Sequence, residues 1–183
     1  TLVGGGGAID SSGGFTAGTV AGPFPNTVRA SVQSATGPVE AAASVAVRPG
    51  PLARVTISPT QATLDIGASQ RFTAQVTDQF GNAITDALVS WSMSGGVGTL
   101  DNTQVFKAGT KAGAFHGAVR VDVIQGAARA SAAADVTVLP FRVTVKSTAD
   151  RGDARPGDGA CDDGNGDCTL RAAIMEANAQ VAG

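Results

Sequence analysis

The sequence contains no tyrosine and a single tryptophan, and aromatic residues make up only 4% of its 183 residues. Aromatic side chains supply much of the buried area in large cores, so this scarcity argues against a large enzyme core. Glycine, alanine, valine, threonine and serine dominate instead. This composition favours small β-domains with light cores, and the length suits one or two of them.

Charge, long apolar runs and common catalytic motifs are also scarce. The formal net charge is −2, which gives no electrostatic reason to expect nucleic acid or an anionic membrane as a partner. No apolar run approaches the roughly 20 residues of a membrane-spanning helix, and no targeting segment is visible. Nucleophile-elbow, phosphate-loop and dinucleotide-binding patterns are missing. We expect no membrane insertion of this segment, no cofactor and no catalysis.

A tandem repeat organises the chain. The stretch 106–120 occurs once more 91 positions earlier, so that Phe106 matches Phe15, and the same spacing still holds at Pro49 and Pro140. The matching residues of the earlier copy are Asp10, Phe15, Ala17, Gly18, Thr19, Ala21, Gly22, Phe24, Val28 and Arg29. A fixed spacing without gaps indicates a repeated domain. A period of roughly 90 residues suits one small β-sandwich.

Residues 1–50 correspond to the second half of one repeat unit. Three short β-prone runs, 15–17, 27–33 and 39–47, are separated by Gly, Pro and Asn. Counterparts of residues 51–94 are missing here, so we expect the chain to be an internal fragment of a longer polypeptide. Half a sandwich cannot bury both of its sheets, and we expect it to be only marginally stable alone.

Residues 51–140 correspond to a complete unit. Apolar and polar residues alternate along short runs, as they do in half-buried strands. Turn residues separate these runs, and together they predict about seven strands in an antiparallel β-sandwich. The predicted structural core is Phe72, Val76, Val89, Trp91 and Phe106.

Two motifs of this unit are specific enough to suggest a family. The first is Val76-Thr77-Asp78-x-Phe80-Gly81-Asn82, followed by Val89-Ser90-Trp91-Ser92. The second is the repeated Phe-x-Ala-Gly-Thr-x-x-Gly with a following Val-Arg. The chain resembles the bacterial Ig-like domains that repeat in invasin- and intimin-type surface proteins. This resemblance covers residues 51–140 fully and 1–50 partly, and it implies one complete and one partial Ig-like sandwich. No cysteine pair bridges the sheets here, so Trp91 is expected to pack against aliphatic side chains.

Residues 141–183 depart from the repeat and predict a strand–loop–helix module. Phe141–Lys146 alternates apolar and polar residues, as a strand does. A loop rich in Asp, Gly and Pro follows, and then an amphipathic helix, for which Thr169 or Asp167 is the predicted N-cap. The predicted apolar face of this helix is Leu170, Ala173, Ile174 and Ala177.

This last segment resembles the module that is named for its Cys-Ser-Leu-Arg-Glu-Ala (CSLREA) run. Here the run is Cys168-Thr169-Leu170-Arg171-Ala172-Ala173, with Thr169 and Ala172 departing from the family's residues. In that family the module precedes a right-handed parallel β-helix in secreted and surface proteins. The resemblance implies an exported protein whose β-helix would begin near residue 183. The module would cover the open end of the β-helix core.

Cys161 and Cys168 are the only two cysteines of the chain. In an exported protein we expect them to form a disulfide, which would close a short loop and contribute roughly 2–3 kcal/mol in the chain-entropy model. A redox-active pair is disfavoured because the spacing is not Cys-x-x-Cys. A metal site is disfavoured because the single histidine, His116, is distant in the sequence.

The residues Asp163, Asn165 and Asp167 are a weak calcium candidate. They have the spacing of the first oxygen ligands of a Ca²⁺ loop, but Cys168 and Ile174 stand where that loop needs Gly and Glu. A tight turn explains the same residues without an ion. We therefore predict no metal site.

Four other features have simple structural explanations. Arg151–Asp153 spells the tripeptide that animal integrins recognise, but three common loop residues arise easily by chance. His116 has no recurring partner for acid–base chemistry, since Pro25 stands at its position in the first copy. The recurring Asp10 and Asp101 are predicted turn residues. Trp91 is predicted to be a core residue before it is a platform for stacking sugars.

Two functional hypotheses follow from these patterns. In the first, the chain is a non-catalytic piece of a secreted or surface bacterial protein, attached to the outer membrane through other regions. Its tandem Ig-like stalk would present a β-helix for adhesion to a host-cell or extracellular glycan or protein, with little flexibility at Pro49-Gly50-Pro51. In the alternative, these domains are the carbohydrate-binding or positioning appendage of a polysaccharide-degrading β-helix enzyme. A third hypothesis is that the unit 51–140 itself binds a glycan or protein.

Overall fold

A computed structural model describes residues 1–182 of the chain. The chain divides into two compact units. The first comprises Thr1–Val55, Gln75–Leu88 and Val123–Ala130, and the second comprises Thr56–Ala74, Val89–Asp122 and the residues from Ser131 onward. The proposed division of the sequence at residues 50 and 140 stays a prediction.

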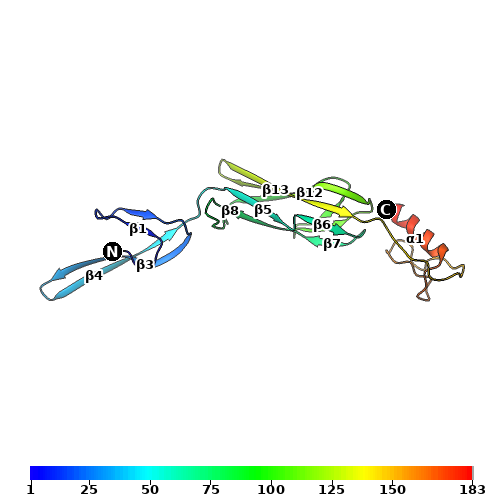
Figure 1. The fold of residues 1–183 in the computed structure, drawn as a ribbon, viewed down its shortest axis with the longest axis horizontal. Coiled ribbons are helices and arrows are strands. Elements are labelled where there is room, and N and C mark those ends of the chain that lie inside the picture. Colours follow the sequence, from blue (N-terminus) through cyan, green and yellow to red (C-terminus); the bar gives the residue numbers. More distant parts are fainter. Residues whose placement is uncertain (183) are drawn as a thin grey trace. The chain divides into compact units, whose positions relative to one another are not determined.

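The protein is mainly β, with antiparallel sheets and one helix near the C-terminus (Figure 1). The first repeat copy contains β1 (Gly7–Ile9), β2 (Phe15–Ala17), β3 (Gly22–Ser34) and β4 (Gly37–Val47). The complete unit contains β5 (Arg54–Ser58), β6 (Gln61–Leu64), β7 (Ser69–Arg71), β8 (Thr73–Thr77), β9 (Leu88–Met93), β10 (Gly98–Leu100), β11 (Val105–Ala108), β12 (Gly113–Gln125) and β13 (Ala128–Val138). The helix α1 comprises Leu170–Ala182. The predicted fold class is confirmed.

The two copies of the repeat fold alike, strand for strand. β1, β2, β3 and β4 are followed 91 positions later by β10, β11, β12 and β13, and each pair begins within one residue of the same repeat position. The recurring aspartates, Asp10 and Asp101, each accept two backbone N–H bonds at 2.8–2.9 Å through Oδ1. The donors are Ser12 and Gly14 in the first copy and Thr103 and Val105 in the second. Both aspartates are turn residues.

Three sheets build the complete unit. One is four-stranded in the order β6-β13-β12-β9, another is three-stranded in the order β10-β11-β7, and β5 pairs with β8. Within these, β6 pairs with β13 in parallel, with Gln61 opposite Asp135, whereas β11 pairs with β10 and β7 antiparallel. The consecutive strands β5 and β6 therefore belong to different sheets. A strand pair that changes sheets in this way forms a corner of a sandwich.

The core of the complete unit is aliphatic around one aromatic pair. Phe72 and Phe106 are fully buried, and their ring centroids lie 6.4 Å apart at an interplanar angle of 79°. An edge-to-face pair adds about 0.5–1.5 kcal/mol to the free energy gained by burying the rings. The other buried apolar residues of this unit are Ile57, Ile84, Val97, Ala108, Ala118, Val119, Val121, Val123, Ala134, Val136 and Val138.

The prediction that Val89 belongs to the core is wrong, because its side chain is 45% exposed. Strand β9 is the last strand of its sheet, and an edge strand lacks a neighbour on one side. Leu88 and Val89, at the start of β9, are therefore left uncovered. Trp91 and Val76, two other members of the predicted core, are half-buried.

The predicted strand Phe141–Lys146 is absent, so this part of the strand–loop–helix prediction is wrong. No strand forms over residues 141–146, and the nearest pairing is an isolated parallel bridge between Ser147 and Thr169. The N–H groups of Lys146 and Ser147 both donate to the carbonyl of Cys168, at 2.8 and 3.2 Å. Because two successive donors share one acceptor, the regular ladder of a β-sheet cannot develop.

Helix α1 begins directly after Thr169. The Oγ1 atom of Thr169 accepts the N–H of Ala172 at 3.1 Å, so Thr169 rather than Asp167 is the N-cap. No helix within residues 1–182 has the length and apolarity to cross a bilayer.

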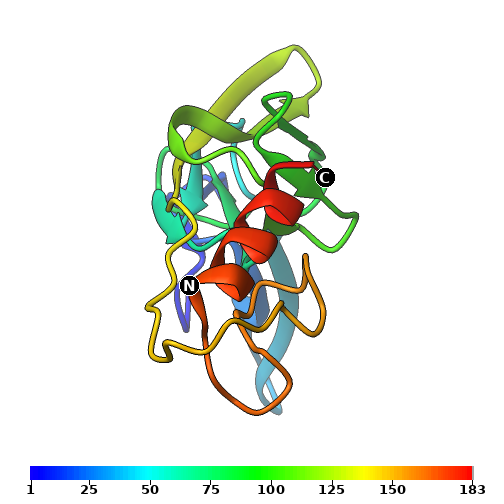
Figure 2. The ribbon, with the colours of Figure 1, turned by 90° about the vertical axis from the view of Figure 1, so that its right-hand side faces the viewer.

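The buried face of α1 differs from the predicted apolar face. Ala172, Ala173 and Glu176 are buried, whereas Leu170 and Ile174 are 62% and 52% exposed. Figure 2 shows α1 with the preceding loop folded along one side of it. Short alanine side chains permit this close approach. The buried Glu176 carboxylate holds the loop to the same face by accepting the N–H groups of Gly157 and Gly159. The bulkier Leu170 and Ile174 instead line a surface pocket together with Thr148, Ala149 and Asp150.

Candidate functional site

A dense set of polar contacts centres on the loop 78–82, which follows β8 and lies within the first compact unit. Asp78 is only 3% exposed. Its Oδ1 accepts the N–H groups of Phe80 and Asn82 at 2.8 and 2.9 Å. Its Oδ2 accepts the N–H of Gly50 and the Nδ2–H of Asn82, both at 2.8 Å. Gly81 adopts φ +86°, a conformation that glycine tolerates best. Asp78 thus closes its own loop and holds Gly50.

Asn82 reaches back to the first repeat copy. Its Oδ1 accepts the N–H of Ala21 at 2.9 Å, and its Nδ2 donates to the carbonyl of Thr19 at 2.8 Å. A side-chain amide suits this task because it offers a donor and an acceptor together, which a carboxylate cannot. The second motif of the repeat, Ala17–Gly22, therefore supplies the backbone groups that Asn82 binds.

The linker 49–51 is held from two sides. Proline has no N–H, so Gly50 and Leu52 are the first residues around Pro51 that can donate. The N–H of Gly50 binds Asp78, and that of Leu52 binds Oε1 of Gln125 at 2.7 Å. The Nε2 of Gln125 in turn donates to Asp86 at 3.0 Å. The N–H of Gly50 in the linker and that of Leu52 directly after it are thereby both fixed. We call the set Asp78, Asn82 and Gln125 the linker clamp.

The charge state of Asp78 follows from these contacts. Burial raises the pKa of Asp78, but hydrogen bonds from Asn82, Gly50 and Phe80 stabilise the carboxylate and outweigh it. The pKa of Asp78 falls from its ordinary value of 3.8 to about 2. The carboxylate is therefore ionised at neutral pH, and it acts as an acceptor only.

Comparisons with known proteins give a limited result. No family model matches the chain, and no curated protein matches it. The chain is similar in part to domains 4 and 5 of the S-layer protein SbsC, with a TM-score of 0.39 and 17% identity, over 72% of this chain and 64% of that one. It is also similar to the S-layer protein rSbsC(31-844), with a TM-score of 0.35 and 16% identity, over 79% of this chain and 19% of that one. The chain spans less than two thirds of either structure.

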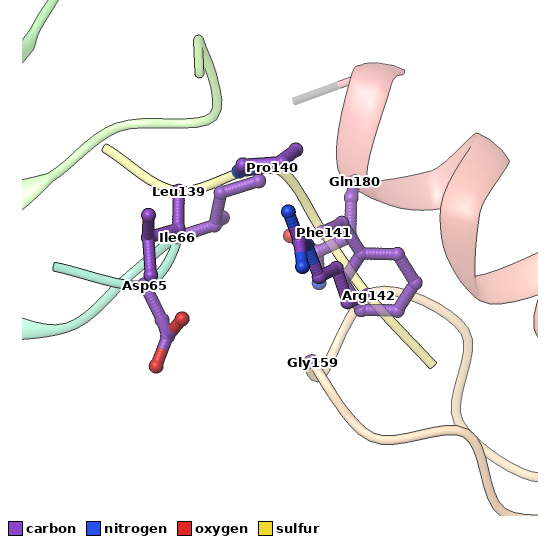
Figure 3. A pocket seen from close by; sticks show the side chains of 8 residues that line it. All are labelled: Asp65, Ile66, Leu139, Pro140, Phe141, Arg142, Gly159 and Gln180. Atoms are coloured by element: carbon purple, nitrogen blue, oxygen red, sulfur yellow. The ribbon is translucent and has the colours of Figure 1, made fainter. Parts of the chain in front are cut away.

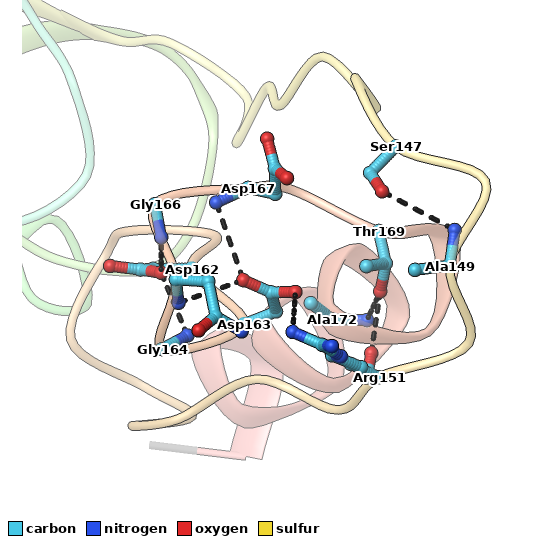
Figure 4. Close-up of polar contacts among 11 residues, drawn as sticks. Ser147, Ala149, Arg151, Asp162, Asp163, Gly164, Gly166, Asp167, Thr169 and Ala172 are labelled. Atoms are coloured by element: carbon cyan, nitrogen blue, oxygen red, sulfur yellow. Dashed lines mark hydrogen bonds and ion pairs between the residues drawn. The ribbon is translucent and has the colours of Figure 1, made fainter.

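The weak calcium candidate forms a turn (Figure 4). The Oδ1 of Asp163 accepts the N–H groups of Asn165 and Asp167 at 2.9 and 3.3 Å. Its Oδ2 lies 3.7 Å from Nη1 of Arg151, and its side chain is 2% exposed. The hydrogen bond from Asn165 holds the pKa of Asp163 below its ordinary value. Within residues 1–182, no group of three or more His, Cys, Asp or Glu side chains is arranged to hold a metal ion.

The Arg151-Gly152-Asp153 tripeptide is folded into the same loop. Asp153 is buried, and its Oδ1 accepts the N–H of Arg155 at 2.8 Å. Its other oxygen lies 3.4 Å from the N atom of Asp162. Arg151 is engaged with Asp163. The carboxylate is therefore used inside the loop rather than displayed to a partner.

The predicted disulfide is present between Cys161 and Cys168, with the two Cα atoms 5.1 Å apart. It joins the loop to the residue before the N-cap of α1. The carbonyl of Thr169 lies 3.9 Å from both sulfur atoms. The bond therefore fixes the loop where the helix begins.

Glu176 is a contact residue that the sequence analysis missed. Its side chain is fully buried on α1 and accepts the N–H groups of Gly157 and Gly159 and the Nε2–H of Gln180. Burial raises the pKa of Glu176, but these hydrogen bonds outweigh it and leave the pKa below its ordinary value. Glutamate in a helix normally faces solvent, so its residue type alone does not indicate this burial. It ties the glycine-rich loop to the helix.

His116 makes one polar contact at the protein surface. The His116 side chain is 87% exposed, and its Nδ1 lies 3.2 Å from Oδ2 of Asp135. Asp135 also accepts the N–H of Gly117 at 2.8 Å, as Ser44 Oγ accepts that of Asn26 in the first copy.

A cavity of about 410 Å³ lies at the end of β13 (Figure 3). Its lining residues are Asp65, Ile66, Leu139, Pro140, Phe141, Arg142, Gly159 and Gln180.

Proposed function

We propose that this chain is a non-catalytic spacer in a secreted or cell-surface bacterial protein. Tandem repeats of the bacterial Ig-like type would hold a distal region away from the cell and present it for adhesion. The segment 141–183 would be a CSLREA-type module ahead of a parallel β-helix. Outer-membrane attachment through other regions, and a host-cell or extracellular glycan or protein as ligand, belong to the same proposal.

The linker clamp is the single observation that carries this proposal. Two repeat copies joined by a free linker would bend at it and could not keep a fixed spacing. Here Asp78 and Gln125 bind the donors of the linker, and Asn82 binds backbone groups of the preceding copy. Side chains of the complete unit thus hold both the linker and the preceding copy. A spacer needs a junction that is held in this way.

The disulfide supports an exported location. Structural disulfides persist in oxidising compartments outside the cytosol, and Cys161 and Cys168 form one in a loop that otherwise has little apolar cover. Nothing within residues 1–182 favours the alternative, in which these domains assist a polysaccharide-degrading enzyme.

NMR relaxation of the full chain tests the proposal. If the linker clamp makes a stiff junction, amides of β3–β4 and amides of β12–β13 report the same rotational correlation time. In the Asn82→Ala variant the first copy is released and its correlation time falls below that of the complete unit. Gln79→Ala is the matched control, because Gln79 lies in the same loop and is exposed. Different correlation times for the two copies in the unchanged protein would refute the spacer.

A further inference from the structure

Three pairs of residues in the glycine-rich loop have the chemistry of self-modification. Asp158-Gly159, Asp163-Gly164 and Asn165-Gly166 are the only places in the chain where Asp or Asn is followed by Gly. The last two lie inside the ring that the disulfide between Cys161 and Cys168 closes. Glycine has no Cβ to hinder its backbone N atom. That atom can therefore attack the Cγ atom of the preceding side chain.

A carboxylate of another residue holds each of these three glycine N–H groups. The N–H of Gly159 donates to Oε1 of Glu176 at 2.6 Å. The N–H groups of Gly164 and Gly166 both donate to Oδ1 of Asp162, at 2.8 and 3.0 Å (Figure 4). Every backbone N atom that could attack a neighbouring side chain in this way is thus bound elsewhere in the folded loop.

A carboxylate that accepts the N–H suppresses the attack in two ways. The N atom must lose its proton before it acts as a nucleophile, and the resulting anion would face the negative charge of the carboxylate. The hydrogen bond must also break before the N atom can turn towards Cγ, and a bond to a charged acceptor is stronger than one to a neutral acceptor. These bonds therefore keep the loop chemically stable while it is folded.

Asn165 is the most reactive of the three positions. Its side-chain amide can leave as ammonia, whereas an ionised aspartate has no comparable leaving group. The Asn165 side chain is exposed, and the bond that holds Gly166 is the longest of the three. The other four asparagines of the chain are followed by Thr or Ala, whose side chains hinder the attack.

We propose that Asn165 is a covalent modification site, at which the chain converts its own asparagine to isoaspartate or aspartate, and that Asp162 controls the reaction. The N atom of Gly166 loses its proton and bonds to Cγ of Asn165. The Cγ–Nδ2 bond breaks, and Nδ2 takes up a proton and leaves as ammonia. Water then opens the cyclic imide. Cleavage between the N atom and Cγ gives aspartate, and cleavage between the N atom and the main-chain carbonyl carbon of residue 165 gives isoaspartate.

The modification changes the loop permanently. Either product adds a negative charge to a ring that already contains Asp162, Asp163 and Asp167, and like charges repel. Isoaspartate also lengthens the main chain by a methylene group, within a ring that ends at the residue before the N-cap of α1. Modified Asn165 therefore marks molecules whose loop has opened. The inference does not depend on the spacer, since it needs only this loop.

Peptide mapping by mass spectrometry tests the proposal. The full oxidised chain is incubated at mildly alkaline pH, and the replacement of the Asn165 NH2 group by OH is followed with time. In the Asp162→Ala variant we expect conversion to be about tenfold faster or more, the factor for losing one hydrogen bond to a charged group. Asp167→Ala is the matched control, since Asp167 joins the turn through its main chain among the described residues. Asn102, which is exposed and followed by Thr103, is the internal reference in each digest.

The disulfide gives a second arm of the same experiment. Reduction should accelerate the conversion in the unchanged chain, because the open ring no longer holds Asp162 against Gly166. A peptide of residues 155–170 with alkylated cysteines gives the rate without any protection. The circular dichroism at 222 nm shows whether α1 is intact in each variant before incubation. If Asp162→Ala loses its helix, Asp162→Asn takes its place, and its uncharged acceptor should give an intermediate rate.

Three results would overturn the proposal. The first is conversion of Asn165 in the oxidised chain as fast as in the peptide, which would mean that the loop gives no protection. The second is equal rates in the variants at Asp162 and Asp167, which would exclude Asp162 as the controlling group. The third is no conversion of Asn165 after reduction or in either Asp162 variant, which would mean that the position is not a modification site.

Discussion

Replacing Phe106 by alanine should strongly lower the free energy of unfolding of the complete unit. The same change at Phe15 should lower the stability of the first repeat copy much less. Phe106 is fully buried, and a buried Phe→Ala change costs about 3–5 kcal/mol, including the cavity that it leaves. The loss of the edge-to-face contact with Phe72 accounts for about 0.5–1.5 kcal/mol of this. Phe15 occupies the same repeat position but is half-buried, so its replacement removes less contact and leaves no closed cavity.

The single tryptophan makes the comparison selective. Trp91 lies in β9 of the complete unit, so its fluorescence during urea or thermal unfolding reports on that unit and not on the first copy. For a domain of this size, a loss of 3 kcal/mol lowers the melting temperature by roughly 12 °C or more. Phe106→Ala should show such a shift, and Phe15→Ala should leave the Trp91 transition within about 2 °C, or about 0.5 kcal/mol.

Two outcomes would contradict this reasoning. Equal shifts for both variants would mean that the two copies share one core, so that repeat position alone decides the cost. A shift below about 1 kcal/mol for Phe106→Ala would mean that the cavity collapses without loss and that the Phe72–Phe106 pair contributes little.

Three further changes test the polar contacts. Because the pKa of Asp78 falls from 3.8 to about 2 on folding, its charged form stabilises the fold fully above about pH 4, and this contribution is lost as the pH falls towards 2. Asp78→Asn should abolish that part of the acid dependence of the urea midpoint, whereas an unchanged profile would exclude Asp78 as its source. Replacing Cys161 and Cys168 by serine should cost the C-terminal segment about 2.5 kcal/mol by the chain-entropy model, measured as an earlier loss of the helical circular dichroism at 222 nm; an unchanged helical transition would contradict this. Glu176→Gln should lower the midpoint of the same helical transition, because one acceptor oxygen replaces two at the amides of Gly157 and Gly159. Gln180→Ala should have a smaller effect. Equal effects would argue against the buried carboxylate as the main contact.

Features that depend on local pattern were predictable from the sequence. The repeat spacing located equivalent strands, because alternating apolar residues and glycine-rich turns fix strands locally. The turns at Asp10 and Asp101 followed from the same repeat. Short separation in sequence brought Cys161 and Cys168 together, and polar residues ahead of an apolar helical run limited the N-cap of α1 to Asp167 or Thr169.

Features that depend on which segments become neighbours needed the tertiary structure. The bonds from Asn82 to Thr19 and Ala21 join groups more than 60 positions apart, and main-chain acceptors and donors leave no mark in the sequence. Val89 has the alternation of a buried strand residue, yet the position of β9 at the sheet edge leaves it exposed. The face of α1 that packs was decided by where the loop with Gly157 and Gly159 lies, since periodicity gives the spacing of a face but not its partner. The local sequence thus determined where strands, turns and the helix form in this protein. The packing of segments that are distant in sequence decided which faces of them are buried.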